Sequence, residues 1–113
     1  MRVQKPKITA NALTQHTLRV LALKGYHAWR NNNAGVYDAT KKVYRANSTT
    51  KGIPDILGYR KSDARFLAVE IKAGKDRLTQ EQADFIVSLQ DAGGVAYVVR
   101  SIDDIEKLIN EVL

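Results

Sequence analysis

Three ionisable side chains stand in the sequence where they could act together on a phosphodiester. Residues 65–73 have the apolar character of a buried strand, yet this stretch carries Glu70 and Lys72. Alternate residues of a strand share a face, so these two side chains point the same way. Charges in an apolar strand are costly unless they are paired or bind a metal. Asp55 begins the preceding apolar run. Two carboxylates and a lysine that converge at a sheet edge can hold Mg²⁺ and act on a phosphodiester.

The sequence predicts an antiparallel pair of strands that would position these groups. Pro54 cannot donate a ladder hydrogen bond, which suits the first position of a strand, and the apolar residues 55–59 follow. Residues 61–64 have turn composition, and residues 65–73 form the second strand. The start of one hairpin strand lies beside the end of the other. We therefore expect Asp55 at the same end of the sheet as Glu70 and Lys72.

Helices and further strands are expected around this pair. Thr9 or Asn11 can cap a helix that ends near Lys24, and Thr79 can cap a second helix that runs to about Ala92. Residues 95–99 form a buried strand that can return parallel to residues 65–73 through the second helix. The remaining expected elements are a strand at 26–30, weak strands within 36–46 that form a hairpin or a mobile flap, and a final helix at 103–113. This order predicts an α/β fold with a mixed central sheet flanked by helices.

Length and composition are typical of one soluble globular domain. The 113 residues are expected to form a single domain over residues 1–113, with residues 1–8 as a loose basic tail. The chain has no cysteine, which excludes disulfides and thiolate metal sites. No apolar run approaches the roughly 20 residues that span a bilayer. The basic N-terminus has no apolar segment after it, so it does not have the pattern of a secretory signal.

The net charge of +6 is distributed unevenly along the chain. Residues 1–37 contain six Lys or Arg and no acid, and residues 38–75 contain nine against four acids. Residues 76–113 contain three against eight acids. A basic surface attracts polyanions through counterion release and steering. The asymmetry, together with the charges in the strand, favours a nucleic acid as the partner.

Each candidate residue also has a purely structural interpretation. Glu70 and Lys72 could form a cross-strand charge network, and Asp55 could serve as a turn former. Gln82 completes a capping-box pattern with Thr79, but it is also in register with the inward stripe of its helix. Both interpretations of Gln82 remain open. The two histidines of the chain are too isolated to form a metal site.

The combined pattern resembles the VRR-NUC family of the PD-(D/E)xK nuclease superfamily. The resemblance covers roughly residues 12–110. It rests on Gly52-Ile53-Pro54-Asp55, Glu70-Ile71-Lys72, Leu78-Thr79 followed by Gln82, and Gly93-Gly94 leading into Val98-Val99-Arg100-Ser101. It implies a restriction-endonuclease-like αβββαβ core and a metal-dependent nuclease that acts on DNA. Some small relatives in this family are homodimers that resolve four-way DNA junctions.

The resemblance also implies roles for individual residues. Asp55 and Glu70 would bind Mg²⁺ or Mn²⁺, and the carbonyl of Ile71 would add a ligand. Lys72 would orient or activate the attacking water, and Gln82 would position Lys72 or the metal shell. The chain departs from the family at the first helix, which often carries a supporting Glu. Here no acid precedes Asp38, and Gln15 or His16 occupies that neighbourhood.

These observations predict a DNA endonuclease dependent on Mg²⁺ or Mn²⁺ that acts on branched DNA in replication, recombination or repair. We expect a homodimer with no membrane association and no organic cofactor, in the cytoplasm of a bacterial or phage-infected cell. The alternative is a non-catalytic nucleic-acid-binding module. A restriction-like enzyme with sequence specificity is a third possibility, but the small size leaves little room for a recognition domain. The basic residues expected to contact DNA are Arg30, Lys41, Lys42, Lys51, Lys75 and Arg77.

Overall fold

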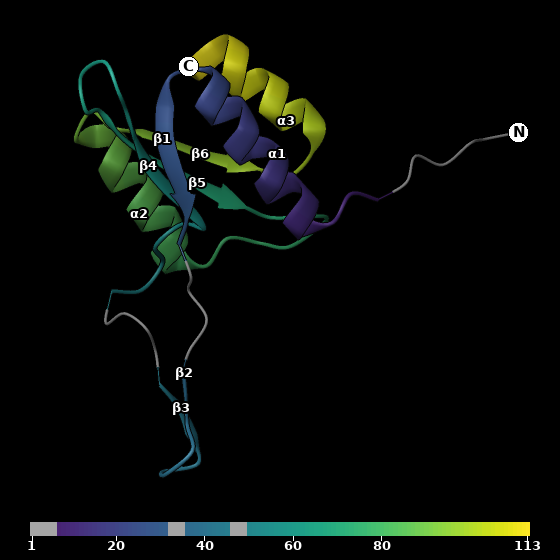
Figure 1. The fold of residues 1–113 in the computed structure, drawn as a ribbon, viewed down its shortest axis with the longest axis vertical. Coiled ribbons are helices and arrows are strands. Elements are labelled where there is room, and N and C mark those ends of the chain that lie inside the picture. The colour runs from purple at the N-terminus through teal and green to yellow at the C-terminus, as the bar shows by residue number, and fades with distance from the viewer. Residues whose placement is uncertain (1–6, 32–35, 46–49) are drawn as a thin grey trace, which may run out of the picture.

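A four-stranded mixed sheet forms the centre of the molecule (Figure 1). The computed structural model describes residues 7–31, 36–45 and 50–113. The strand order is β1–β4–β5–β6, in which β1 and β4 are antiparallel, β4 and β5 are antiparallel, and β5 and β6 are parallel. The strands are β1 (Tyr26–Arg30), β4 (Ile56–Arg60), β5 (Phe66–Ile71) and β6 (Val95–Val99). This topology confirms both the predicted hairpin and the predicted parallel return.

Helix α2 (Gln80–Asp91) makes the crossover that a parallel pair of strands requires. It begins at Thr79, whose side chain accepts a hydrogen bond from the Gln82 N–H, and Gly93 follows its end with φ +94°. Helix α1 (Ala10–Leu23) is capped by Thr9 rather than by Asn11. In Figure 1, α1 and the C-terminal helix lie together on one side of the sheet, and α2 lies on the other. Taken in sequence order, α1, β1, β4, β5, α2 and β6 form the predicted αβββαβ core.

A hydrophobic core lies between the sheet and the helices α1 and α3 (Ile102–Lys107). Leu67, Val69 and Ile71 alternate along β5 and point into it, as the period of a strand dictates. Their partners from the helices are Leu13, Leu21, Ile105 and Leu108. The intervening residues Ala68 and Glu70 are buried on the opposite face of β5. Burial on both faces makes β5 the central strand of the molecule.

A second, two-stranded sheet projects away from the main body (Figure 1). It pairs β2 (Val36–Asp38) with β3 (Val43–Arg45) in antiparallel register, so the weak strand signal of residues 36–46 corresponds to a hairpin. Its turn is held by Asp38, whose carboxylate accepts hydrogen bonds from the N–H groups of Thr40 and Lys41 at 3.0 and 3.2 Å. Residues 32–35 and 46–49 lie outside the described residues.

The two ends of the chain differ in detail from the sequence-based expectation. The last helix is not uniform: α3 (Ile102–Lys107), capped by Ser101, continues into a π-helical turn (Leu108–Val112). At the other end, Ile8 packs against the core although its segment was expected to be loose, and residues 1–6 lie outside the description. Within the described residues, no helix is long and apolar enough to cross a membrane.

Candidate active site

The paired strands bring Asp55 and Glu70 to the same end of the sheet. In the β4–β5 register Ile56 lies opposite Val69. The next residues toward this end of the sheet are Asp55, just before β4, and Glu70 on β5. The Asp55 carboxylate oxygen Oδ2 accepts a 3.0 Å hydrogen bond from the N–H of Ile71. This bond fixes the side chain across the end of β5. The expected convergence at one sheet end is therefore confirmed.

The backbone of the segment before β4 is held from two sides. The N–H of Asn31 donates to the Asp55 carbonyl at 2.6 Å, and its side-chain amide donates to the Pro54 carbonyl at 3.4 Å. On the other side Gly52, with φ +79°, lies so close to α2 that a Cβ there would be 2.4 Å from the Glu81 carbonyl carbon. A side chain at Gly52 would thus push the loop away from α2. These contacts set where Asp55 enters the sheet.

Glu70 is buried next to this carboxylate. It is 2% exposed, and its Oε2 atom has no hydrogen-bond partner among the described residues. The pKa of Glu70 is raised to about 8, first by burial and then by a hydrogen bond with Asp55 and the negative charge of Asp55, while the charge of Lys72 offsets part of the shift. A buried carboxylate that faces a second carboxylate lacks a positive partner. A divalent cation between them would supply it.

The donor set suits a hard divalent cation. Mg²⁺ prefers oxygen ligands and keeps several waters, so a few carboxylates and a carbonyl suffice. Within residues 7–31, 36–45 and 50–113, no group of three or more His, Asp or Glu side chains is placed to hold a metal. Asp55 and Glu70 form a pair of carboxylates at this end of the sheet, and the unpartnered Glu70 oxygen fits a cation.

Lys72 lies just beyond the end of β5. Its N–H donates to the Val99 carbonyl at 2.9 Å, which extends the β5–β6 ladder by one residue. Its side chain is half-buried, and its charge is felt by Glu70. The structure therefore brings three of the predicted site residues, Asp55, Glu70 and Lys72, to one end of the sheet.

Gln82 occupies the capping box of α2. Its Oε1 atom accepts a 2.9 Å hydrogen bond from the Thr79 N–H, and its own N–H donates to the Thr79 hydroxyl at 3.2 Å. Of the two interpretations of Gln82, the structure bears out the cap. The first turn of α2 that it stabilises is also the turn that Gly52 contacts.

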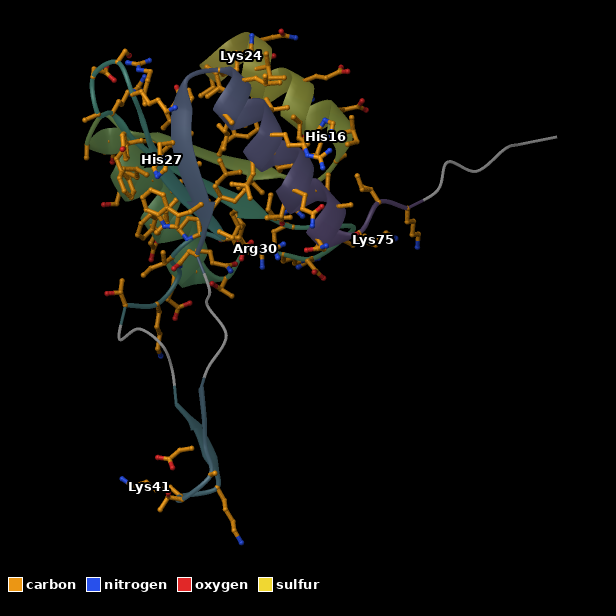
Figure 2. The ribbon with its side chains drawn as sticks, viewed as in Figure 1. His16, Lys24, His27, Arg30, Lys41 and Lys75 are labelled. Atoms are coloured by element: carbon orange, nitrogen blue, oxygen red, sulfur yellow. The ribbon has the colours of Figure 1, made fainter. Side chains whose placement is uncertain are left out.

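The basic residues expected to contact DNA are distributed over several elements. Arg30 ends β1 beside Asp55, whereas Lys41 and Lys42 lie at the turn of the projecting hairpin (Figure 2). Lys75 and Arg77 are exposed on the loop that follows β5, and Lys51 is exposed before Pro54. Of these six, Arg30 alone lines the pocket at the site.

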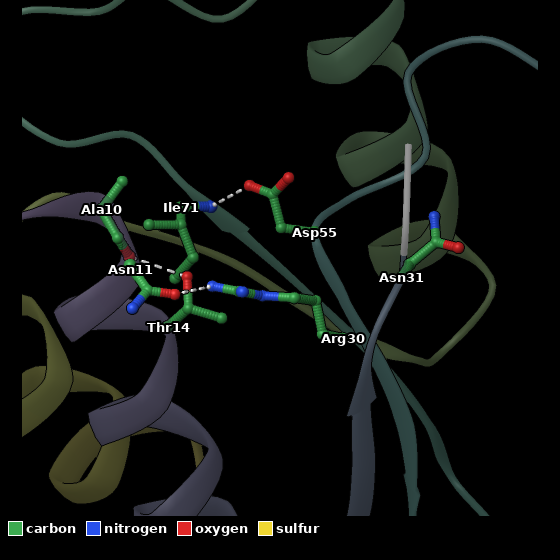
Figure 3. A pocket seen from close by; sticks show the side chains of 7 residues that line it. All are labelled: Ala10, Asn11, Thr14, Arg30, Asn31, Asp55 and Ile71. Carbon is green, nitrogen blue, oxygen red and sulfur yellow. Dashed lines mark hydrogen bonds between the residues drawn. The ribbon is translucent and has the colours of Figure 1, made fainter. Parts of the chain in front are cut away.

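An open pocket of about 720 Å³ adjoins Asp55 (Figure 3). The sheet end contributes Arg30, Asn31, Asp55 and Ile71 to its wall, and α1 contributes Ala10, Asn11 and Thr14. Gln15 and His16, which were expected in this neighbourhood, are exposed and do not line the pocket. Residues 10, 11 and 14 share one side of a helix at the spacing i, i+1, i+4. That spacing is the sequence signal that could have identified Asn11.

Replacement of Glu70 by Gln should change how stability depends on pH. The pKa of Glu70 is about 8 in the folded chain against an ordinary value of 4.5, so the folded state retains the proton longer. The stability due to this proton is full below about pH 4.5 and is lost as the pH rises through about 8. In thermal unfolding with EDTA, Glu70→Gln should melt above the wild type near pH 9, with a smaller difference near pH 5. The exposed control Glu81→Gln should show no such trend, and a pH-independent difference for Glu70→Gln would contradict the expectation.

Comparison with known proteins agrees with this geometry. The family model of the VRR-NUC domain matches residues 13–103. No curated protein matches the chain. Among solved structures it is similar to Hjc of Archaeoglobus fulgidus, a Holliday junction resolvase from an archaeal hyperthermophile, with 25% identity and a TM-score of 0.50. That match covers 78% of this chain and 64% of the resolvase, so the chain spans less than two thirds of that protein.

A second solved structure, a VRR-NUC domain protein, has a TM-score of 0.57 and 19% identity. The match covers 94% of this chain and 88% of the other chain, and it supports the fold alone. Both neighbours have the restriction-endonuclease-like fold. The domain match extends over most of the chain and includes Asp55, Glu70 and Lys72. The chain belongs to the VRR-NUC family of nucleases.

Proposed function

We propose that the chain is a DNA endonuclease dependent on Mg²⁺ or Mn²⁺ that hydrolyses phosphodiester bonds in branched DNA. The observation that carries the proposal is the buried Glu70 carboxylate, which has an unpartnered oxygen and lies beside Asp55, a residue that lines an open pocket. Membership of a nuclease family supports the reaction class. The likeness to a Holliday junction resolvase supports a branched substrate. We also propose a homodimer, as the family resemblance implies.

Asp55, Glu70 and the Ile71 carbonyl would hold the cation. The hydrogen bond from the Ile71 N–H leaves the second oxygen of Asp55 for the cation, and the unpartnered Oε2 of Glu70 is a second ligand. When bound, the cation stabilises charge on the reacting phosphate and lowers the pKa of a water. It also offsets the repulsion between the two carboxylates.

Lys72 and Gln82 would complete the site in different ways. Lys72 shares a face with Glu70 and supplies a compact positive charge where phosphate oxygens gain negative charge in the transition state. From there it would orient the attacking water. Gln82 acts as a positioning residue, because it stabilises the first turn of α2. The loop that contains Gly52 packs against this turn and leads directly into Asp55.

The remaining basic residues would contact the DNA backbone outside the cleavage site. Lys51, Lys75 and Arg77 are exposed on loops that flank the site residues in the sequence. Lys41 and Lys42, at the end of the hairpin, would reach phosphates further away (Figure 2). Contacts of this kind position a duplex without reading its bases, which suits selection by DNA shape rather than by sequence.

Removal of any of the three charged site residues should abolish cleavage. Glu70→Ala, Asp55→Ala and Lys72→Ala should each lower the cleavage rate by roughly 10²-fold or more, because each removes a group that acts in the transition state. The assay compares a four-way junction, a fork, a flap and a linear duplex of the same sequence. Lys61→Ala, an exposed lysine at the opposite end of β4, is the matched control and should cleave as the wild type does. Full activity of Glu70→Ala or Lys72→Ala would refute the assignment of the site.

Chelation should abolish cleavage, and added Mg²⁺ or Mn²⁺ should restore it. Calorimetry of the protein with Mn²⁺ should detect binding that is lost in Glu70→Ala, since that variant lacks a ligand. This measurement also separates the nuclease from a non-catalytic nucleic-acid-binding module, which needs no cation. Tight DNA binding by the wild type without any binding of Mn²⁺ would favour the module.

Loss of the α2 cap should affect activity through stability. Thr79→Ala and Gln82→Ala each remove half of the same capping box, so each should lower the free energy of unfolding by about 1 kcal/mol. If Gln82 acts through the cap, the two variants should also lower the cleavage rate equally at a temperature where both are folded. A much larger loss in Gln82→Ala would instead place its side chain in direct contact with Lys72 or the cation shell.

A further inference from the structure

Arg30 is placed at the cleavage site by the register of the sheet. In the β1–β4 ladder Arg30 lies opposite Ile56, the residue that follows Asp55. The next residue, Asn31, donates its N–H to the Asp55 carbonyl at 2.6 Å. The guanidinium of Arg30 therefore enters the pocket from the same sheet end as the carboxylate of Asp55, and both line its wall (Figure 3).

A neutral side chain of α1 holds this guanidinium. Arg30 Nη2 donates a 2.9 Å hydrogen bond to Asn11 Oδ1, which lies 19 residues earlier in the chain (Figure 3). An exposed arginine without such a contact samples many rotamers, and ordering it on binding costs conformational entropy. The amide oxygen orients Arg30 without neutralising its charge. Among the described residues, no carboxylate forms an ion pair with Arg30.

The other arginines with a described contact are used differently. Arg60 is paired with the Asp63 carboxylate, which cancels its charge. Arg65 donates through Nε to the Gly93 carbonyl at 2.6 Å, and Arg100 donates to the Asp76 carbonyl. These contacts tie loops to the body of the protein. Arg30 is held instead by a side chain that also lines the pocket, and most of its N–H donors remain available.

The chemistry of the pocket indicates which ligand would use these donors. A guanidinium has five N–H donors in a planar fork, and one of them satisfies Asn11. The remaining donors match two oxygens of a phosphodiester in a bidentate contact. A phosphate in this pocket beside Asp55 also needs a positively charged partner. The lining residues that α1 contributes carry no charge, because they are Ala10, Asn11 and Thr14.

We infer that Arg30, oriented by Asn11, binds the DNA phosphate that occupies the pocket beside Asp55, at the cleaved linkage or directly next to it. Asn11 is the positioning residue of this contact. The inference rests on the proposed nuclease function and specifies how that site holds its substrate. The first helix thus contributes an uncharged acceptor that orients a cation for the phosphate, at a site where it has no carboxylate.

The test measures binding of a fluorescent four-way junction with Ca²⁺ in place of Mg²⁺, since Ca²⁺ accepts the same oxygen ligands with looser geometry. A set of junctions carries one uncharged methylphosphonate at each position within two linkages of the cleaved bond. Arg30→Ala should weaken binding of the unmodified junction roughly tenfold, as expected for loss of a charge-assisted hydrogen bond. It should also lower the slope of log K against log salt by about 1.

The decisive measurement is whether the loss of binding caused by a methylphosphonate depends on the presence of Arg30. This dependence is the coupling between the protein substitution and the DNA modification. One methylphosphonate position should weaken binding by the wild type but have no further effect on Arg30→Ala. Asn11→Ala should lose part of this coupling, and Asn11→Asp should lose more, because a carboxylate there would neutralise Arg30. Arg19→Ala removes an exposed arginine of the same helix outside the pocket. It should keep the full coupling.

Two results would overturn the inference. The first is that Arg30→Ala and Arg19→Ala bind the junction equally well, and that every methylphosphonate weakens binding by Arg30→Ala as much as it weakens binding by the wild type. In that case Arg30 does not bind a phosphate in the pocket. If the wild type cleaves the junction with Mg²⁺ under these conditions, the proposed function stands without the inference. If the wild type neither binds nor cleaves DNA, the proposed function fails and the inference fails with it. Melting temperatures of all variants, expected to match the wild type, exclude unfolding as the cause of a binding defect.

Discussion

The Glu70 carboxylate is buried beside Asp55 at the end of an otherwise apolar sheet. An ionised carboxylate that is 2% exposed and has an unpartnered oxygen destabilises the fold, and a second carboxylate nearby increases the cost. A protein without a use for the pair would be more stable with apolar residues there. The proposed site for a divalent cation would explain why both acidic residues stand at the end of an otherwise apolar sheet.

The surrounding elements hold the two carboxylates in place. Glu70 is fixed by β5, which is buried on both faces and paired on both sides. Asp55 precedes β4 and depends on contacts from outside that strand. Asn31 holds its backbone, the Ile71 N–H holds its side chain, and the loop that contains Gly52 packs against α2. Glu70 is therefore held by the strand itself, whereas Asp55 is held by contacts from β1, β5 and α2.

Helix α1 contributes one wall of the pocket. The residues of α1 that line the pocket are uncharged, and Asn11 accepts a hydrogen bond from Arg30. In the proposed function, Asp55 and Glu70 would be the acidic ligands of the cation, and Arg30 would face the phosphate. The basic charge of the first two thirds of the sequence would then act both near the cleaved bond and along the hairpin.

The local pattern of residues determined the elements and the identity of the carboxylate pair. The run from Phe66 to Ile71 is apolar on both faces except at Glu70, and the Thr79 and Gly93 signals bound α2, so strand and helix follow from periodicity and capping. Asp55 could be placed near Glu70 because hairpin geometry alone brings the two strand ends together. The capping role of Gln82 was also visible in its spacing from Thr79, although spacing could not choose between the two interpretations.

Only the tertiary structure decided which residues of other elements reach the site. The rotation of α1 against the sheet depends on how Leu13, Thr17 and Leu21 pack, and this rotation turns Asn11 toward the pocket and Gln15 and His16 away from it. The contact between Asn11 and Arg30 joins residues 19 positions apart on separate elements, so no local pattern encodes it. Hairpin register is a local property that a sequence can specify. The orientation of a helix on a sheet is set by the sum of its packing contacts, which exist only in the folded chain.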